Sequence, residues 1–293
     1  ARILVCTILL QRSSVKSLTF LGDMFVGVQC PCILFQLIGT GKPLSTAGMM
    51  IEDRIRTYTI AMERTVVPEN FSFRMTDEEY RVLEKIKNSI PVCYLADHAD
   101  FALGIVTGNN KKFLSAEKTE HSEMVLKGTD ICKYHINPVK QYLRFEPEQF
   151  QQVAPLEIYR APEKLLYRFI SNQLVVAYDD RQMLSLNSCN IVIPKIEGMQ
   201  IKYILAILNS SVSQFVYQKE FHSIKVLRAH MEHIPIPRVG KAIQNEIIAM
   251  TEPLICGMGK EAAETCQKRL DCRIMDLFRL SAEEQWIIRH ALH

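Results

Sequence analysis

Two stretches of the chain repeat their hydrophobic residues at helical spacing. Between residues 201 and 215 the apolar side chains fall on one face of a helix, and we expect that face to pack on a sheet. After residue 240 two more apolar stripes, at 243–258 and 263–277, predict two helices joined by a turn at Gly257. The end of the chain is therefore predicted to be a helical hairpin.

Two capping boxes mark helix starts. In such a box a Ser or Thr side chain and a Glu three residues later each bond the other's backbone. The pair Thr76 and Glu79 predicts a helix that runs to about Lys87, and the pair Ser281 and Glu284 predicts a short final helix. Both predictions rest on local hydrogen bonding alone.

Strand patterns occupy the first part of the chain. Residues 18–21 and 32–38 are continuous apolar runs, which are typical of strands buried on both faces of an α/β sheet. Between residues 42 and 74 apolar and polar residues alternate without a strong period, and we interpret this stretch as an extended connector.

The middle of the chain is predicted to mix strands with one short helix. The strands are residues 101–106, 173–178 and 190–193. The helix is expected at residues 163–170.

Composition limits the class of protein. A chain of 293 residues with 48% hydrophobic residues can bury a sizeable core, and it holds one large or two medium domains. The net charge of +3 permits a polyanionic partner without requiring one. The nine cysteines are scattered through apolar stretches, which indicates reduced thiols and a cytoplasmic protein. Because no Cys-x-x-Cys pair is present, we expect no metal site.

The apolar segments near the N-terminus do not indicate export. Residues 2–10 are apolar, but no small-residue cleavage site follows them. The run from residue 24 to 38 contains polar residues and a proline, and is too short to span a bilayer. We expect neither a targeting segment nor a membrane partner. Because the chain begins at Ala1 in mid-pattern, we expect it to be part of a longer protein.

One predicted turn carries side chains suited to nucleic acid. A strand ending at Val106 runs into a Gly/Asn turn whose amides suit base edges and whose lysines suit phosphates. Its candidate residues are Thr107, Asn109, Asn110, Lys111 and Lys112. Considered by itself, this segment is more typical of a solvated hairpin turn.

A second candidate segment, residues 219–241, has more lysine and arginine than glutamate. It contributes Lys225 and Arg228 as candidate phosphate contacts, although an ordinary solvated face has the same composition. The cations of the two segments are called the basic set below: Lys111, Lys112, Lys225 and Arg228.

Short sequence blocks in a fixed order carry a resemblance to a known family. They are Leu95-Ala-Asp97 with Gly104-Ile-Val-Thr107-Gly108-Asn109-Asn110, Leu126-Lys-Gly128-Thr-Asp130, Leu174-Val-Val-Ala-Tyr178-Asp179, Tyr203-Ile-Leu-Ala-Ile-Leu208-Asn209-Ser210, and His233-Ile-Pro-Ile-Pro237. Together they resemble the TaqI-like C-terminal specificity domain, the target-recognition region of gamma-class adenine-N6 DNA methyltransferases and fused restriction-modification enzymes. The resemblance implies recognition of double-stranded DNA, which the module would position for base flipping and methylation.

The upstream residues 20–28 resemble a late methyltransferase motif, in which an aromatic side chain packs on the extruded adenine. The resemblance implies that Phe25 is this stacking residue. The alternative for Phe25 is a core phenylalanine in a β-hairpin.

The resemblance implies an α+β fold in four parts. These are a C-terminal remnant of an α/β methyltransferase core at 1–40, a connector with one helix at 41–94, a mixed-sheet target-recognition domain at 95–240, and a helical hairpin at 241–293.

The chain departs from a complete methyltransferase in its motifs. It has no glycine-rich S-adenosylmethionine loop and no Asn-Pro-Pro-Tyr tetrapeptide, and Asn137-Pro138-Val139-Lys140 is the nearest match. We expect it to bind no cofactor and to be inactive alone, with S-adenosylmethionine bound by the missing methyltransferase core of the longer protein. The strand at 32–38 would then leave an open sheet edge, which invites self-association.

Two other functions stay open. A stand-alone specificity or scaffold subunit would bind DNA and pair with a partner subunit through the helices at 241–280, but the methyltransferase-like residues 1–40 argue against it. A small-molecule enzyme on an α+β fold is disfavoured, because the sequence offers no convergent acid, base and nucleophile.

Overall fold

The computed structural model describes residues 13–27, 31–39, 41, 45–64, 73–221 and 223–292. The chain divides into two compact units, residues 1–83 and 84–293. The apolar segment at residues 2–10 lies outside the described residues, as do parts of the predicted connector.

The first unit is built on a four-stranded sheet with the order β2-β1-β3-β4. The strands are β1 (Ser13–Asp23), β2 (Pro31–Gly39), β3 (Met50–Glu52) and β4 (Thr57–Thr59). β1 pairs antiparallel with β2 and parallel with β3. Its buried core is formed by Val15, Leu18, Met49, Ile51, Ile60 and Phe73.

Both apolar runs of this unit are strands, as predicted, but the second run is not buried. β2 is an edge strand, and its large apolar side chains between Ile33 and Ile38 are 39% to 60% exposed. Only β1 pairs with it among the described residues. An α/β core is not present in the described part of this unit. β3 and β4 were not predicted, because strands of three residues are too short to show a period.

Helix α2 (Asp77–Asn88) begins at the predicted capping box and crosses the boundary between the units. The backbone N–H of Thr76 donates to the Glu79 carboxylate at 2.8 Å, and the N–H of Glu79 donates to the Thr76 hydroxyl at 3.3 Å. This reciprocal pair confirms the first helix start.

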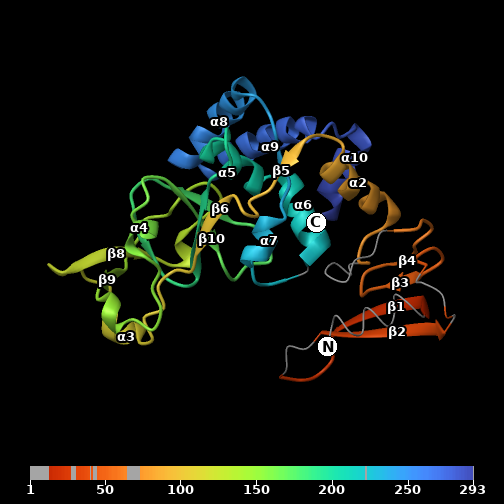
Figure 1. The fold of residues 1–293 in the computed structure, drawn as a ribbon, viewed down its shortest axis with the longest axis horizontal. Coiled ribbons are helices and arrows are strands. Elements are labelled where there is room, and N and C mark those ends of the chain that lie inside the picture. Colours follow the sequence, from red (N-terminus) through yellow and green to blue (C-terminus); the bar gives the residue numbers. More distant parts are fainter. Residues whose placement is uncertain are drawn as a thin grey trace. The chain divides into compact units, whose positions relative to one another are not determined.

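The second unit combines two sheets with a group of helices (Figure 1). One sheet is antiparallel with the order β11-β10-β13-β6, and the other has the order β12-β8-β9-β7. Their strands are β6 (Ala99–Ala102), β7 (Leu114–Ser115), β8 (Ser122–Leu126), β9 (Tyr142–Arg144), β10 (Lys164–Arg168), β11 (Val176–Asp179), β12 (Leu184–Ser185) and β13 (Cys189–Pro194). β5 (Val92–Cys93) pairs separately with β14 (Ile236–Pro237). One hydrophobic core joins both sheets, with Val125, Leu143, Leu166 and Ile191 among its buried members.

The helices of the second unit differ in length. The longer ones are α5 (Ile201–Asn209), α6 (Ser211–Phe221), α8 (Lys241–Cys256), α9 (Lys260–Leu277) and α10 (Ala282–Ala291). The short ones are α3 (Asn110–Phe113), α4 (Leu156–Tyr159), α7 (Arg228–Glu232), and the 3-10 turns η1 (Gly128–Asp130) and η2 (Pro147–Gln149). α5 packs on β10 and β11 of the β11-β10-β13-β6 sheet, as predicted for the amphipathic segment at 201–215.

The predicted helical hairpin is confirmed. α8 contacts α9, and Gly257 between them has a φ of +79°, a left-handed conformation that favours glycine. The second capping box also forms, because Ser281 and Glu284 bond each other's backbone at the start of α10. No helix in the described part of the chain is long and apolar enough to cross a bilayer.

Two of the predicted helices differ from the structure. Residues 163–170 form β10 rather than a helix, because this strand lies between β11 and β13 and is buried on both faces. A run without alternation gives no period by which to recognise a strand. The helix predicted at 201–215 is divided at Ser210, whose hydroxyl accepts the N–H of Ser213 and so caps the start of α6.

Candidate nucleic-acid interface

The predicted turn is fixed to the core of the second unit by close backbone contacts. At Gly104 a Cβ atom would lie 2.1 Å from the carbonyl oxygen of Leu186, so no side chain fits there. Val106 then exchanges two backbone hydrogen bonds with Gln152, of 2.9 and 3.1 Å. The turn itself begins at Gly108, with a φ of +74°. Its path is therefore set before the exposed residues begin.

The polar side chains of the turn bond mainly to the turn itself. The hydroxyl of Thr107, which is 4% exposed, donates to Oδ1 of Asn110 at 2.6 Å. Oδ1 of Asn109 accepts the backbone N–H of Lys112 at 3.3 Å and caps α3. The two predicted amides therefore shape the turn and use their oxygens to do so.

The two lysines of the turn differ in their surroundings. The Lys112 ammonium donates to Oε1 of Gln149 at 2.6 Å and lies 4.8 Å from the centre of the Phe113 ring. Lys111 is exposed and makes no side-chain hydrogen bond or ion pair with the described residues. Lys111 is therefore the less constrained of the two cations.

Of the two candidate cations in the second segment, Lys225 precedes α7 and Arg228 is its first residue. The Lys225 ammonium is 6.0 Å from the centre of the Phe169 ring. The Arg228 guanidinium forms an ion pair with Glu232 at 2.7 Å and lies 5.2 Å over the Phe101 ring. Glu232, one of the acidic residues of this segment, therefore neutralises part of this surface by pairing with Arg228.

His230 holds the beginning of α7, a role that the sequence did not indicate. Its Nδ1 accepts the backbone N–H of Leu227 at 3.2 Å, and its ring stacks on Phe221 with 4.4 Å between the centroids. Burial lowers the pKa of His230, which favours the neutral ring that this hydrogen bond requires. A histidine with a stacking partner nine residues earlier gives no recognisable pattern in the sequence.

β6 connects the two candidate segments. Phe101, which lies under Arg228, precedes Thr107 by six residues, and six extended residues span at most about 20 Å. In the view of Figure 1, α3 lies at the lower end of the second unit and α7 at mid-height, with α8 and α9 at its top. About 20 Å corresponds to roughly six base-pair steps. One short duplex is therefore long enough to span Phe101 and Thr107, and the joint contact of the two segments with DNA stays a prediction.

One sequence family matches the central part of the second unit. Residues 123–236 match the TaqI-like C-terminal specificity domain. The family model covers less than half of the chain. The match confirms the resemblance carried by the sequence blocks. It includes Lys225 and Arg228 and does not extend to the turn at 107–112 or to Phe25. No curated protein sequence matches the chain.

Solved restriction-modification proteins resemble the chain that carries this specificity domain. The type IIL enzyme MmeI in complex with DNA superposes with a TM-score of 0.59, over 99% of this chain and 47% of that chain, at 10% identity. The type IIG endonuclease BpuSI gives 0.39 at 10% identity, over 93% and 44%. The HsdS subunit from Thermoanaerobacter tengcongensis gives 0.36 at 13% identity, over 74% and 50%. The chain thus spans about half the length of these proteins, and the likeness to MmeI shows the fold alone.

Phe25 lies outside the specificity domain, in the turn between β1 and β2 of the first unit. It is 62% exposed, and its neighbours Met24 and Val26 are 57% and 103% exposed. This exposure contradicts the alternative of a core phenylalanine. The stacking of Phe25 on a base stays a prediction.

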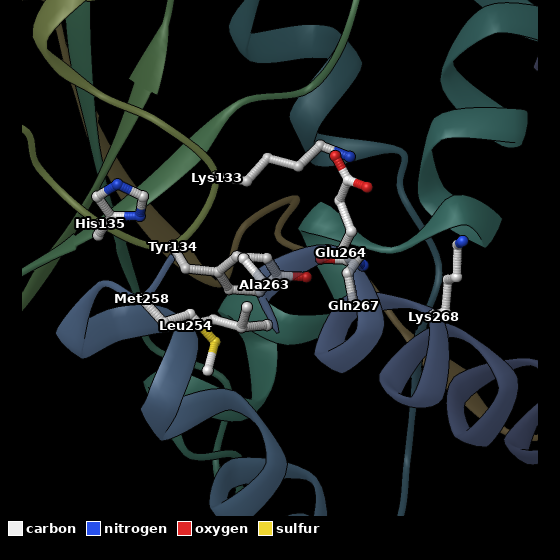
Figure 2. Close-up of a pocket in the computed structure, with 9 residues that line it drawn as sticks. All are labelled: Lys133, Tyr134, His135, Leu254, Met258, Ala263, Glu264, Gln267 and Lys268. Atoms are coloured by element: carbon white, nitrogen blue, oxygen red, sulfur yellow. The ribbon is translucent and has the colours of Figure 1, made fainter. Parts of the chain in front are cut away.

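Two adjoining cavities lie where the specificity domain meets the α8–α9 hairpin. The first has a volume of about 360 Å³ and is largely apolar, with Leu254 and Met258 in its wall (Figure 2). The second, of about 550 Å³, is more polar and shares Lys133 and Lys268 with the first. The candidate DNA-contacting residues line neither cavity. No group of three His, Cys, Asp or Glu residues in the described ranges is arranged to hold a metal ion.

Tyr134 fixes the specificity domain to this hairpin. It has a φ of +75°, is 2% exposed, and points its ring toward Gln267 of α9 (Figure 2). The backbone N–H of Tyr134 donates to the Val176 carbonyl at 2.7 Å, which ties the loop to β11. Burial raises the pKa of the Tyr134 phenol. Because the ring fills the junction between the two elements, we interpret this site as a packing contact.

Proposed function

We propose that the chain is the DNA target-recognition part of a site-specific adenine-N6 DNA methyltransferase or restriction-modification enzyme. The match of residues 123–236 to the TaqI-like specificity domain carries this proposal. The fold that the chain shares with MmeI, an enzyme solved in complex with DNA, supports double-stranded DNA as the partner.

Two kinds of contact would act on the duplex. The basic set would bind phosphates and fix the register, and uncharged polar groups would read base edges in the major groove. The contacts of the four cations support unequal roles. Lys111 and Lys225 make no ion pair with the described residues. Arg228 would have to leave Glu232, or its guanidinium would have to bind Glu232 and a phosphate together.

Methylation of an adenine inside a duplex requires the base to be extruded, at a cost of a few kcal/mol. Phe25 would stack on the extruded base, since its ring is exposed at the tip of the β1–β2 hairpin. S-adenosylmethionine and the residues that hold the adenine amino group would come from a catalytic domain outside this chain. The exposed apolar side chains of β2 support such a neighbour.

Fluorescence-anisotropy titration of labelled duplexes with the whole chain tests the proposal. We expect binding at low salt, with log K falling linearly against log salt by about 0.9 for each phosphate neutralised. We also expect a minority of sequences to compete more strongly than the rest. A chain that binds no duplex at low salt would overturn the proposed function.

A further inference from the structure

Residues 149–152 lie alongside the candidate turn. Gln152 pairs with Val106 through two backbone hydrogen bonds. A Cβ atom at Gly108 would lie 3.4 Å from Cβ and 3.7 Å from Oε1 of Gln151. The side chain of Gln151 therefore lies against the open backbone of the turn, where no side chain intervenes.

Aromatic packing holds residues 149–152 in place. Phe150 makes edge-on contacts with Phe113 and Phe145, with 5.2 and 5.8 Å between the ring centroids. Phe150 has an extended backbone (φ −83°, ψ 147°), and the next residue, Gln151, is exposed. A side chain on a fixed backbone loses less freedom when it binds.

Hydrogen bonds already made by the turn limit what its asparagines can read. An amide that reads adenine with two hydrogen bonds needs its oxygen for N6 and its nitrogen for N7. The oxygen of Asn109 accepts from the Lys112 backbone, and that of Asn110 accepts from the Thr107 hydroxyl. Each asparagine therefore has only its nitrogen fully available without giving up a bond that shapes the turn.

The glutamines among residues 149–152 differ in how much of their side-chain amide is already hydrogen-bonded. Oε1 of Gln149 accepts from Lys112 at 2.6 Å, and its Nε2 donates to Glu146 at 2.8 Å. Gln151 makes no side-chain hydrogen bond with any described residue, so both atoms of its amide are available. Gln152 is exposed as well, and its contact with the turn is the pair of backbone hydrogen bonds with Val106.

We propose that Gln151 reads one adenine of the target duplex through both atoms of its amide, while Asn109 and Asn110 hold the turn beside it. This inference rests on the proposed function, and it moves base reading from the asparagines of the turn to a residue 42 positions after Asn109.

The test is a selection of bound duplexes from a random-sequence library, carried out with the whole chain and followed by sequencing. The variants are Gln151→Ala and Gln151→Glu. The matched control is Gln173→Ala, which changes another exposed glutamine without a side-chain hydrogen bond, beside the polar cavity. Because the Gln151 side chain makes no hydrogen bond with the described residues, its variants should have the same melting temperature as the natural chain.

We expect the natural chain to prefer adenine at one position of the bound sequences. Gln151→Ala should reduce that preference by about 5- to 150-fold and leave the other positions unchanged. Gln151→Glu should shift the preference to cytosine, because a carboxylate accepts from the cytosine amino group. The control should select the same sequences as the natural chain.

The outcomes separate this inference from the function on which it rests. If the natural chain selects a sequence and every adenine preference persists in Gln151→Ala, the role of Gln151 is refuted and DNA recognition stands. If the natural chain binds no duplex, the proposed function fails and the inference fails with it.

Discussion

Lys164 of β10 and Asp179 of β11 form a buried ion pair inside the specificity domain. They are direct partners in the strand register, their charged atoms are 2.6 Å apart, and both side chains are 0% exposed. The ammonium also donates to the Tyr159 carbonyl at 2.6 Å. The carboxylate also accepts the backbone N–H groups of Arg181 and Met183, at 2.9 and 3.0 Å. The pair thus connects two strands and the turn that follows them.

Asp179→Asn removes the negative charge and keeps an oxygen for the turn. Lys164 is then a buried cation without a counterion. Burial already lowers the pKa of Lys164, and Asp179 opposes that shift in the natural chain. At about pH 7.4, taking the proton from a lysine with an ordinary pKa of about 10.4 costs about 4 kcal/mol. Because the folded variant can always lose this proton, we expect the free energy of unfolding to fall by about 3 to 4 kcal/mol.

Urea denaturation of the whole chain, followed by circular dichroism, measures this loss. In the variant the unfolded chain binds a proton on Lys164 up to about pH 10.4, whereas the folded chain does not. The destabilisation should therefore shrink by about 1.4 kcal/mol per pH unit from neutral pH to about pH 10. The control Lys164→Met/Asp179→Asn removes the stranded cation and should regain most of the stability. A loss below about 1 kcal/mol without this pH dependence would refute the reasoning.

Three further predictions concern binding and association. Replacing the basic set with alanine should weaken duplex binding and lower the anisotropy salt slope by about 2 to 4, and an unchanged slope would remove this surface from the proposal. Leu34→Lys or Phe35→Lys, on the exposed strand β2, should reduce self-association in sedimentation velocity, and a natural chain that stays monomeric at high concentration would contradict this. Calorimetric titration with S-adenosylmethionine should show no binding, because the cofactor motifs are absent, and micromolar affinity would overturn the expectation.

The helical parts of the fold were predictable because neighbouring residues determine them. The capping boxes at Thr76 and Ser281 form as expected, since each needs only a glutamate three residues later. The turn at Gly257 follows from a glycine placed between two apolar stripes. In each case the signal and the structure that it determines lie within a few residues.

Strand β10 was not predictable in this way. Its sequence, Lys-Leu-Leu-Tyr-Arg, is compatible with a helix, and the residue that decides otherwise is distant. Lys164 is accepted into the core only because Asp179 lies opposite it on β11, 15 residues later. A contact of that kind appears only once the sheet has formed.

The candidate site also combines features that neighbouring residues determine with features that depend on distant residues. The turn after Val106 was predicted from its glycine and asparagines, but the state of each polar group was not. Lys112 is bonded to a residue 37 positions away, and Arg228 lies over Phe101, 127 positions earlier. A sequence shows which donors and acceptors are present, and only the folded chain shows which of them are already in use. Gln151 was overlooked for this reason.

The exposed apolar side chains of strand β2 are suited to contact with a partner outside the described chain. Its continuous apolar run predicts burial on both faces, yet Ile33, Phe35 and Leu37 on one face and Leu34 and Ile38 on the other are all exposed. The strand also has no charged residue, although charges are how natural edge strands avoid unwanted pairing. The pattern is therefore suited to a strand with a further neighbour at its open edge and cover on both faces. A catalytic domain that supplies one more strand and the helices around it would satisfy all three conditions, whereas a second copy of β2 would pair the edge and leave the faces open.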